Sequence, residues 1–487
     1  MPKKTAYAGY PSAVMYKGPA KKGPVQHLLW GDWLQVNRER RDGWCQAHSR
    51  GEDGWLRKES IQPDRLLEVV FVDIGQGDGC LVVTPQDRHI VIDAGEGDNM
   101  YRFLRWRYGG FRKKRTFEAA VISHPDQDHY GGFASLFGDE NVTFNVVYHN
   151  GIVERTGRNS LGQRSKSGRA SYLTHLVASR DELKDFLGVP SRWKGKKYPT
   201  MLHGALASGR VVDCLMLSLA DGFVPGYGPE GDLSMQLLGP VTEPDGRGAP
   251  RLRWLGNVGK TKNGHSIVLR LQYRDVSVLL GGDLNIPAEN LLLGYHTGMA
   301  MPPKTAEQER LVIEAARPIF EVDIAKACHH GSADFSDVYL RATNPIATVI
   351  SSGDDEPHAH PRADALGAIG RWSRGGRPLI FSTELARSAK ESINHPYVLR
   401  HDLREAQKQI EQAATPAAKK RAQKRFDKLL GRIDRSIAVY GAINVRTDGH
   451  SVVIAQKLER PRSKAKKWDI YQLEPMGNGP LRYVSKY

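Results

Sequence analysis

Cysteine and long apolar runs are both scarce in this sequence of 487 residues. The four cysteines are far apart and form no CxxC pair, which argues against a disulfide framework or a zinc ribbon and favours reduced thiols. No run of about 18 apolar residues is present, so we expect no transmembrane helix. The N-terminus also lacks an apolar segment of signal-peptide length. We therefore expect a soluble, cytoplasmic protein that has no membrane partner.

Acidic residues are outnumbered by basic ones. The 70 lysines and arginines exceed the 54 aspartates and glutamates, which gives a formal net charge of +16. Such an excess is typical of proteins that bind a polyanion such as nucleic acid, although many soluble basic proteins share it. The basic residues gather at 105–115, 164–169 and 416–435. In the first of these segments, Lys113 and Lys114 are candidates for contact with a phosphate backbone, and a solvated surface is the alternative.

The length of the chain predicts more than one structural unit. Residues 1–64 contain short apolar segments separated by turn signals, which predicts a small β module. Residues 65–383 alternate strand and helix patterns and predict an α/β domain. Residues 384–436 are highly charged with a helical pattern, so we expect a basic helical insertion that is either solvated or binds nucleic acid or a partner. Residues 437–487 are predicted to supply terminal strands that complete the α/β domain.

Residues 121–133, VISHPDQDHYGGF, hold the densest group of metal-ligand residue types. His124, Asp126, Asp128 and His129 fall within six positions after an apolar run. Burying so many polar groups is costly unless they are paired, and a divalent first-row cation would pair them. At a strand end, residues two apart point the same way, so the first three converge and His129 faces a second ion from the turn. The alternative is an acidic loop with two incidental histidines.

Three other predicted strand ends carry similar residues. Asp93 ends IVIDAG and is either a turn former or the support of a metal-bound histidine. Asp283 follows VSVLLGG, where its carboxylate could bridge two ions with one on each oxygen. His329 and His330 end a third strand; one of them is expected to ligate metal while the other donates to a phosphate or leaving group. The sequence does not say which histidine does which.

Four further residues are weaker candidates. His265 is either a ligand or substrate contact or a solvated turn histidine, and Ser332 is a candidate substrate contact after the paired histidines. His360 lies in a His-rich loop and is a candidate catalytic residue. Asp78, in the turn IGQGDG, is a minor candidate for the rim of the metal site. The segment 241–261 is predicted to be a loop.

Together, the blocks IVIDAG, SHPDQDHYGG, GHSIVL…LLGGDL and KACHHGS…HAHP resemble those of the metallo-β-lactamase-fold hydrolases. More narrowly, they resemble the soluble metallo-hydrolase domain of the ComEC-type competence proteins, in which HxDxDH replaces the commoner HxHxDH. This resemblance covers about residues 66–382 and implies an αββα sandwich. Near the N-terminus, the Gly-Trp pairs at 43–44 and 54–55 and the sequence LRKESI resemble the bacterial SH3-like domain, a small all-β barrel. Such domains bind peptides or cell-wall material, or pack against an enzyme domain, so a protein partner is possible there.

The family resemblance implies a site with two divalent ions, Mn²⁺ or Zn²⁺. His124 and Asp126 correspond to ligands of the first ion, Asp128 and His129 to ligands of the second, and Asp283 to the bridging carboxylate. The last ligand corresponds to the paired histidines; we assign it to His329, with His330 as a catalytic group. Asp93 corresponds to the aspartate that supports the site. The usual middle histidine has no clear counterpart, and His149 and His265 are both candidates.

Two ions would make hydroxide available near neutral pH and stabilise charge on phosphoryl oxygens, with Asp128 orienting the attacking water. An aspartate at position 126 hardens the site and favours Mn²⁺ over Zn²⁺. The resemblance and the net charge together predict a metal-dependent phosphodiesterase or nuclease that cleaves nucleic acid, with DNA favoured. One alternative is hydrolysis of a small phosphodiester, such as a cyclic nucleotide or a phosphorylcholine ester. Another is a non-catalytic adaptor that acts through the SH3-like domain.

Overall fold

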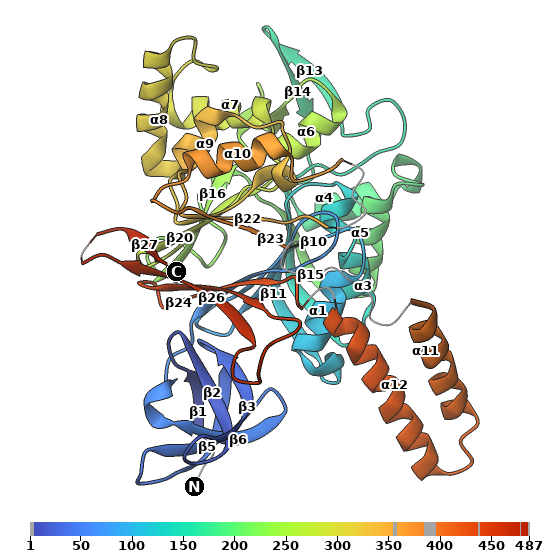
Figure 1. Cartoon of the computed structure of the whole chain (residues 1–487). Coiled ribbons are helices and arrows are strands. Elements are labelled where there is room, and N and C mark those ends of the chain that lie inside the picture. The colour runs from blue at the N-terminus through green and yellow to red at the C-terminus, as the bar shows by residue number, and fades with distance from the viewer. Residues whose placement is uncertain (1–3, 354–357, 384–395, 437–438, 478, 486–487) are drawn as a thin grey trace.

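The main body of the protein is a four-layer sandwich in which two β-sheets pack face to face between two layers of helices (Figure 1). This computed structural model describes residues 4–353, 358–383, 396–436, 439–477 and 479–485. The αββα architecture predicted from the sequence is confirmed. The first part of the predicted insertion, residues 384–395, lies outside the described residues.

The first sheet has ten strands in the order β15-β12-β11-β10-β9-β8-β24-β25-β26-β27. Four of them, β10, β11, β12 and β15, are parallel, so their carboxyl ends share one edge of the sheet. The strands are β8 (Leu67–Phe71), β9 (Gly79–Val83), β10 (His89–Ala94), β11 (Arg115–Ile122), β12 (Val142–His149), β15 (Val211–Met216), β24 (Ile443–Thr447), β25 (Val452–Lys457), β26 (Trp468–Pro475) and β27 (Leu481–Val484).

The second sheet has six strands in the order β16-β19-β20-β21-β22-β23. From β20 onward the strands are parallel, so β20 and β21 also end at one edge. The strands are β16 (Leu233–Gly239), β19 (Val268–Tyr273), β20 (Val276–Leu280), β21 (Ile324–Lys326), β22 (Ala347–Ile350) and β23 (Leu379–Ser382).

The space between the sheets is filled by apolar side chains from both of them, such as Val69, Ile92, Leu269 and Val278. β8, β9 and β20 are buried along their whole length because both of their faces are covered. Strands in such positions have mostly apolar sequences. The first sheet is covered on its outer face by α1 (Asn99–Arg107), α3 (Phe133–Gly138), α4 (Arg180–Leu187) and α5 (Lys197–Ala207). The second is covered by α7 (Ile286–Thr297), α8 (Ala306–Phe320), α9 (Asp337–Thr343) and α10 (Ala363–Trp372).

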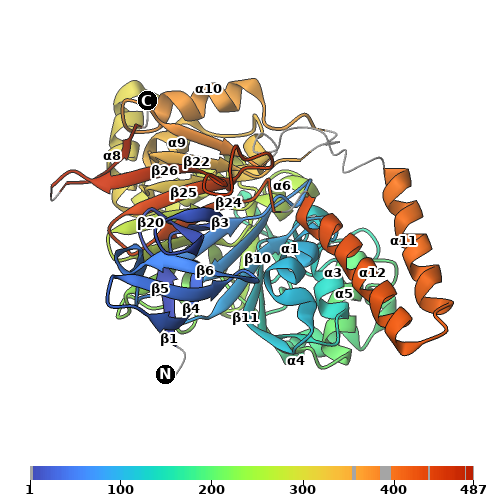
Figure 2. The same cartoon turned by 60° about the horizontal axis from the view of Figure 1, so that its bottom comes forward.

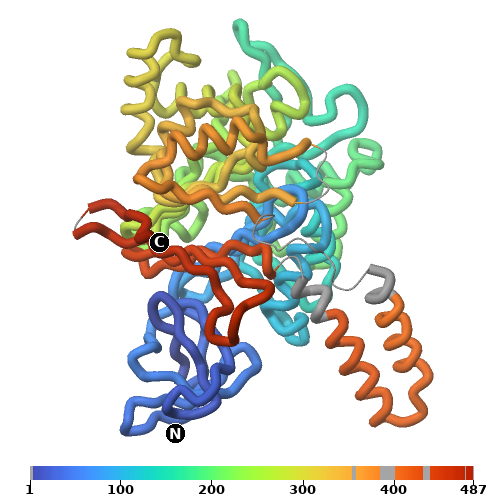
Figure 3. The backbone as a smooth tube through the Cα atoms, viewed as in Figure 1, coloured from blue at the N-terminus to red at the C-terminus, as the bar shows by residue number. Residues whose placement is uncertain are grey.

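The N-terminal domain is a strongly curved sheet of seven short strands around its own apolar core. Its strands are β1 (Lys4–Ala8), β2 (Ser12–Gly18), β3 (Lys22–Leu29), β4 (Trp33–Glu39), β5 (Trp44–Ser49), β6 (Glu52–Arg57) and β7 (Ile61–Gln62). Figures 2 and 3 show this domain against the terminal strands of the first sheet. The contact includes the buried side chains of Trp30, Val453 and Trp468. The last strands of the chain therefore join the N-terminal domain to the sandwich.

A buried ionic network reinforces this contact. Arg446 is 1% exposed and donates to the Trp30 carbonyl at 2.9 Å. Its guanidinium also lies 3.2 Å from Asp32 of the N-terminal domain and 3.3 Å from Glu68 of β8. Arg50 pairs with Asp32 at 2.6 Å. Because buried charges are tolerated only when they are paired, this network fixes how the two domains meet.

The basic region near the C-terminus forms two helices, α11 (Pro396–Glu411) and α12 (Pro416–Ser436). They pack on each other as a hairpin that projects from the sandwich, with α12 beside α1 (Figure 1). Arg112 lies 3.5 Å from Asp427 where the hairpin meets the body. Exposed basic residues lie along α12, namely Lys419, Lys420, Arg421, Lys424, Arg425 and Lys428.

The prediction of a loop at 241–261 is wrong. Most of this segment forms a hairpin of β17 (Thr242–Pro244) and β18 (Pro250–Arg253) and the start of α6 (Val258–Gly264). The hairpin joins β13 (Gln163–Ser167) and β14 (Ala170–Thr174) in a four-stranded sheet outside the sandwich. The strand that pairs with β18, β14, lies about 80 residues earlier in the chain, so local sequence carried no sign of the pairing.

Among the described residues, no helix is long and apolar enough to cross a membrane. The four cysteines form no disulfide, as their spacing predicted.

Asp32 should make the stability of the protein sensitive to acid. Burial alone would raise the pKa of Asp32, but Arg50 and Arg446 lower it from 3.8 to about 2. Because the pKa is lower in the folded state, the ionised carboxylate stabilises the fold by about 2 kcal/mol above about pH 4, and this contribution disappears as the pH falls toward about 2. In urea denaturation, Asp32→Asn should be less stable than wild type at pH 7, and the difference should shrink below about pH 4. The exposed control Asp181→Asn should match wild type throughout, and a pH-independent deficit for Asp32→Asn would contradict the argument.

Candidate metal centre

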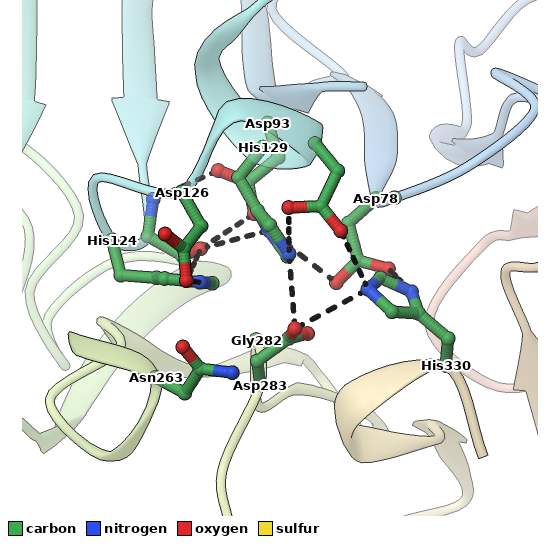
Figure 4. A network of polar contacts seen from close by, with 12 residues as sticks. Asp78, Asp93, His124, Asp126, His129, Asn263, Gly282, Asp283 and His330 are labelled. Atoms are coloured by element: carbon green, nitrogen blue, oxygen red, sulfur yellow. Dashed lines mark hydrogen bonds and ion pairs between the residues drawn. The ribbon is translucent and has the colours of Figure 1, made fainter. Parts of the chain in front are cut away.

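The residues singled out from the sequence meet where strands of both sheets end. Asp93 lies in β10, and His124 follows β11. Asp283 follows β20, and His330 lies in a single 3₁₀ turn, η5 (Cys328–Gly331), directly after β21. Figure 4 shows these side chains pointing toward one another from the two sheets. The parallel strands therefore bring residues up to 237 positions apart to one edge.

Asp128 and His129 come from the short helix α2 (Gln127–Tyr130). Its first turn is closed by the Asp126 carbonyl, which accepts hydrogen bonds from the backbone nitrogens of His129 at 3.0 Å and Tyr130 at 3.2 Å. The IGQGDG turn packs directly on this helix. Gly77 has a φ of +102°, and a Cβ on it would lie 1.7 Å from the Asp128 carbonyl oxygen. Only glycine allows that approach, which explains this glycine without a phosphate-binding loop.

Four side chains converge on one point: Asp128, His129, Asp283 and His330. Asp283 Oδ2 lies 3.2 Å from His129 Nε2 and 3.3 Å from His330 Nε2. Asp128 lies 3.6 Å from His330 Nε2 and 4.0 Å from His129 Nε2. One ligand atom from each of the four residues can be chosen so that all lie within 4.8 Å of one another. This group, the four-residue cluster, has the composition and spacing of a divalent metal site.

Each imidazole of the cluster is oriented by a carboxylate behind it. Asp93 Oδ2 lies 2.8 Å from His129 Nδ1, and the same carboxylate accepts hydrogen bonds from the backbone and hydroxyl of Ser123. Asp78 Oδ1 lies 3.2 Å from His330 Nδ1. A carboxylate on the far nitrogen fixes the ring and leaves Nε2 to face the cluster. The hydrogen bond of His330 Nδ1 goes to the Ser351 carbonyl at 3.2 Å, so Asp78 pairs with this ring by charge, whereas Asp93 is hydrogen-bonded to its ring.

A buried lysine stands behind the carboxylates of Asp78 and Asp283. Lys326, the last residue of β21, is 5% exposed and forms an ion pair with Asp78. Its ammonium lies 3.7 Å from Asp283 Oδ1 and donates to the Gly282 carbonyl at 3.0 Å. Burial alone would lower the pKa of Lys326, but Asp78 and Asp283 raise it, so it is charged at neutral pH.

The pKa values in the cluster reflect its density of negative charge. Burial alone would lower the pKa of His129 and of His330, but Asp283 above all raises both well above the usual value. Burial opposes ionisation of Asp283 as well, yet His129 and His330 hold its pKa well below the usual range. The two imidazoles thus carry protons when no other cation is present, which means that the site attracts positive charge.

The donor set fits a divalent ion. Among the described residues, His129 Nε2 and His330 Nε2 are buried and make no hydrogen bond, although their other nitrogens are well supported. Buried polar atoms without a hydrogen-bond partner are rare in proteins, and here both point at the same carboxylate oxygen. Two imidazole nitrogens and two carboxylates would complete their bonding around one ion.

The structure separates the two histidines that the sequence left open. His330 lies in the cluster, whereas His329 Nε2 is 3.9 Å from Asp283 Oδ2 and its side chain is 26% exposed. The geometry therefore favours His330 as the ligand and His329 as the flanking group, the reverse of our assignment. His360 lies at this outer side, with its ring 5.6 Å from that of His329. The reason is the turn itself, because both histidines have positive φ and consecutive side chains diverge there.

Other predicted residues lie away from the cluster. His265 is fully buried, and its Nε2 lies 2.6 Å from the Arg253 carbonyl, so it is neither a solvated turn residue nor exposed to substrate. Ser332 accepts a hydrogen bond from the backbone of Asp334 at 3.2 Å and caps that turn. Lys113 and Lys114 precede β11, whose eight residues separate them from His124 by about 30 Å. They are exposed, but a group bound at the cluster could reach them only if it were a long polymer.

Sequence reasoning gave little or no weight to three residues of the site: Asp78, Lys262 and Lys326. Lys326 had a usable signal, because a lysine at the end of an apolar strand, directly before a pair of histidines, is seldom placed there without a buried partner. Lys262 had none, because it directly follows the segment 241–261 predicted to be a loop, and it approaches the site from the second sheet side. Its contacts are described below.

Two family models match parts of this chain. Residues 9–63 match the bacterial SH3 domain, and residues 76–209 match the metallo-beta-lactamase superfamily. The chain contains a metallo-β-lactamase domain. Both resemblances inferred from sequence motifs are confirmed, and the sandwich has the fold of the metal-dependent hydrolases of this superfamily.

A curated relative and two solved structures resemble the chain. It is 23% identical over 323 residues to ComE operon protein 3 of Bacillus subtilis (strain 168). That match covers 63% of this chain but 31% of the relative, so the chain spans about a third of the relative's length. A metal-dependent hydrolase of the β-lactamase superfamily is 13% identical, with a TM-score of 0.30 over 65% of this chain and 95% of that one. MEM-A1, a subclass B3 metallo-β-lactamase from a soil metagenome library, is 16% identical, with a TM-score of 0.25 over 53% and 79%.

The geometry of the metallo-β-lactamase domain predicts opposite effects for the two adjacent histidines. His330→Ala should weaken Mn²⁺ or Zn²⁺ binding by at least about 10- to 100-fold, whereas His329→Ala should change it only a few-fold. Titration against a metal-binding fluorescent competitor measures both constants. The pair is well matched, since both positions have positive φ and alanine adds similar strain at each. A larger loss for His329→Ala would show that the ligand is His329.

Proposed function

We propose that the metallo-β-lactamase domain is a metal-dependent phosphodiesterase that cleaves nucleic acid, with DNA as the favoured substrate. The convergence of Asp128, His129, Asp283 and His330 on one point carries this proposal. When bound there, a divalent ion acidifies water and stabilises negative charge on phosphoryl oxygens. Carboxylate oxygens supply half of the donors and no cysteine belongs to the cluster, which favours Mn²⁺ over Zn²⁺.

The side chains of the cluster have different tasks. Asp128 is the most open of the four, with 21% of its side chain exposed, against 4% for Asp283 and 6% for His330. Burial would raise its pKa, but His330 and His129 lower it, so Asp128 is ionised at neutral pH. Its carboxylate can accept a hydrogen bond from an attacking water and orient it. Asp93 and Asp78 pair with the two imidazoles; burial would raise the pKa of Asp78, but Lys326 lowers it.

Charge outside the cluster supports a polymeric substrate. α12 carries eight lysines and arginines against two aspartates, and the six basic side chains that the structure describes there are exposed. Together with the net charge of +16, this helix offers repeated contacts to a phosphate backbone. A small phosphodiester would contact only the cluster and would gain little from a distant basic helix.

Two alternative functions would require different parts of the structure. A hydrolase of a small phosphodiester, such as a cyclic nucleotide or a phosphorylcholine ester, needs the cluster but not α12. An adaptor acting through the SH3 domain needs neither, although that domain is available for a protein partner in all three cases. The partly exposed Asp128 favours a catalytic site over a structural one, because structural metal sites are closed to solvent.

The proposal predicts Mn²⁺-dependent digestion of nucleic acid. Linear, circular and single-stranded DNA, RNA and bis(p-nitrophenyl) phosphate should be incubated with wild type, Asp128→Ala and the exposed control Asp181→Ala. We expect DNA cleavage that Asp128→Ala reduces by at least about 100-fold, because loss of a ligand should exceed the 10- to 100-fold cost of losing its supporting partner. Asp181→Ala should behave as wild type. Hydrolysis of the small ester without cleavage of any nucleic acid would favour the small-molecule alternative.

The substrate class can be tested separately on α12. Replacing Lys419, Lys420 and Arg421 by glutamate should weaken DNA binding and lower its salt dependence by up to about three units of d log K/d log [salt], one for each lost phosphate contact. Hydrolysis of bis(p-nitrophenyl) phosphate serves as the internal control and should be unchanged. Unaltered DNA binding by this variant would remove α12 from the proposal.

A further inference from the structure

The residues assigned to a first metal ion have protein partners of their own. Lys262, from α6, forms an ion pair with Asp126 Oδ1, and its ammonium lies 3.8 Å from Glu154 Oε1. The Asn263 amide satisfies its hydrogen bonds when its oxygen and nitrogen are exchanged relative to Figure 4. In that orientation, its nitrogen donates to Asp126 Oδ2 at 2.8 Å and to the Gly259 carbonyl at 3.0 Å. Both carboxylate oxygens of Asp126 are therefore bound by donors of this chain.

Asp283 is not placed to serve a second ion with its other oxygen. Its Oδ2 faces His129 and His330, whereas its Oδ1 faces the ammonium of Lys326 at 3.7 Å. A carboxylate that bridges two ions with one on each oxygen must offer lone pairs on both sides. Here Oδ1 makes no hydrogen bond to a described residue, but the buried ammonium of Lys326 lies 3.7 Å from it, and this fixed positive charge disfavours a second cation on that side.

A third ligand for the predicted first metal ion, beside His124 and Asp126, is also lacking among the described residues. His149 uses Nδ1 to accept a hydrogen bond from the backbone of Gly151, and its buried Nε2 makes no hydrogen bond but belongs to no group of convergent ligand atoms among the described residues. His265 has a pKa of about 4 because of burial, and it pairs with the Arg253 carbonyl. In the described part of the chain, no ligand atom of a third His, Cys, Asp or Glu converges with those of His124 and Asp126.

The environment of Lys262 suits a working cation. Its side chain is 14% exposed, so the ammonium is largely desolvated yet reachable. Asp126 engages one of its three N–H donors, and Glu154 lies at 3.8 Å without a hydrogen bond, so donors remain for a ligand. A compact ammonium binds a phosphoryl oxygen as a point charge, and such charge-assisted bonds are roughly twice as strong as neutral ones.

We propose that this chain binds one divalent ion, at the four-residue cluster, and that the ammonium of Lys262 takes the place of a first-site ion and binds a phosphoryl oxygen of the substrate. The second half of this statement rests on the proposed phosphodiesterase function, whereas the first half does not. Lys262 thereby becomes a substrate-binding residue that the charges of Asp126 and Glu154 hold in place. Asn263 binds the same Asp126 carboxylate.

Metal stoichiometry tests the first half without reference to activity. After exposure to excess Mn²⁺ and desalting, elemental analysis and native mass spectrometry of the full chain should give one ion per chain. Electron paramagnetic resonance should show an isolated Mn²⁺ signal and no exchange-coupled pair. Two tightly bound ions per chain, or an exchange-coupled spectrum, would overturn the proposal.

Substitution of Lys262 tests the second half. Lys262→Met keeps the length of the side chain and removes its charge; it should leave the first Mn²⁺ affinity within about threefold and lower kcat/KM for a phosphodiester by about 10- to 100-fold. Lys260→Met is the matched control, because Lys260 lies on the same helix, is 43% exposed and pairs with Asp334. It should retain wild-type kcat/KM. Thermal unfolding confirms that both variants are folded, and unchanged kcat/KM in Lys262→Met would exclude the role.

The two proposals fail in different ways. One ion per chain without cleavage of any phosphodiester would end the proposed function and leave the single-ion site standing. Two ions per chain with DNA cleavage would do the opposite.

Discussion

The carboxylate of Asp283 is the point on which the site depends. One of its oxygens faces the Nε2 atoms of His129 and His330, and the other faces the ammonium of Lys326. These partners come from α2 on the side of the first sheet, and from β21 and the turn after it in the second. A carboxylate that is 2% exposed is tolerated only with such counter-charges. Closing the two sheets and assembling the site are consequently one event.

The same requirement explains the outer ring of acidic groups. Asp93 and Asp78 each pair with the far nitrogen of one imidazole, which keeps both Nε2 atoms turned toward Asp283. Gly77 lets the Asp78 turn approach α2 closely enough for the Asp78 backbone to donate to the Asp128 carbonyl at 3.2 Å. The precision of the cluster therefore comes from the turn before β9 as much as from the ligand motif. The buried network of Arg446, Asp32 and Glu68 applies the same rule at the contact with the N-terminal domain.

Much of this architecture could be predicted from sequence, because it is encoded locally. Apolar runs that end in Asp93, His124 or Asp283 identify strands with polar residues at their carboxyl ends, and parallel strands place such ends together. What could not be predicted depends on direction and on distant partners. Two adjacent histidines have equal sequence weight, and only the left-handed backbone of η5 decides that His330 turns inward. Lys262 reaches Asp126 across 136 positions, and no local pattern announces that contact.

The charges around the four-residue cluster and around Asp126 explain why the cluster attracts an ion and the position at Asp126 does not need one. Around the cluster, the carboxylates of Asp78, Asp93, Asp128 and Asp283 are offset by a single ammonium, that of Lys326. The excess of negative charge raises the pKa of both imidazoles, so that they carry protons. A divalent ion would offset the same negative charge equally well. Around Asp126, by contrast, Lys262 lies between two carboxylates, those of Asp126 and Glu154, and burial raises the pKa of Glu154. That position already holds a cation of the chain. A second divalent ion would have to displace Lys262, whereas the ammonium supplies a fixed positive charge without a metal-binding equilibrium.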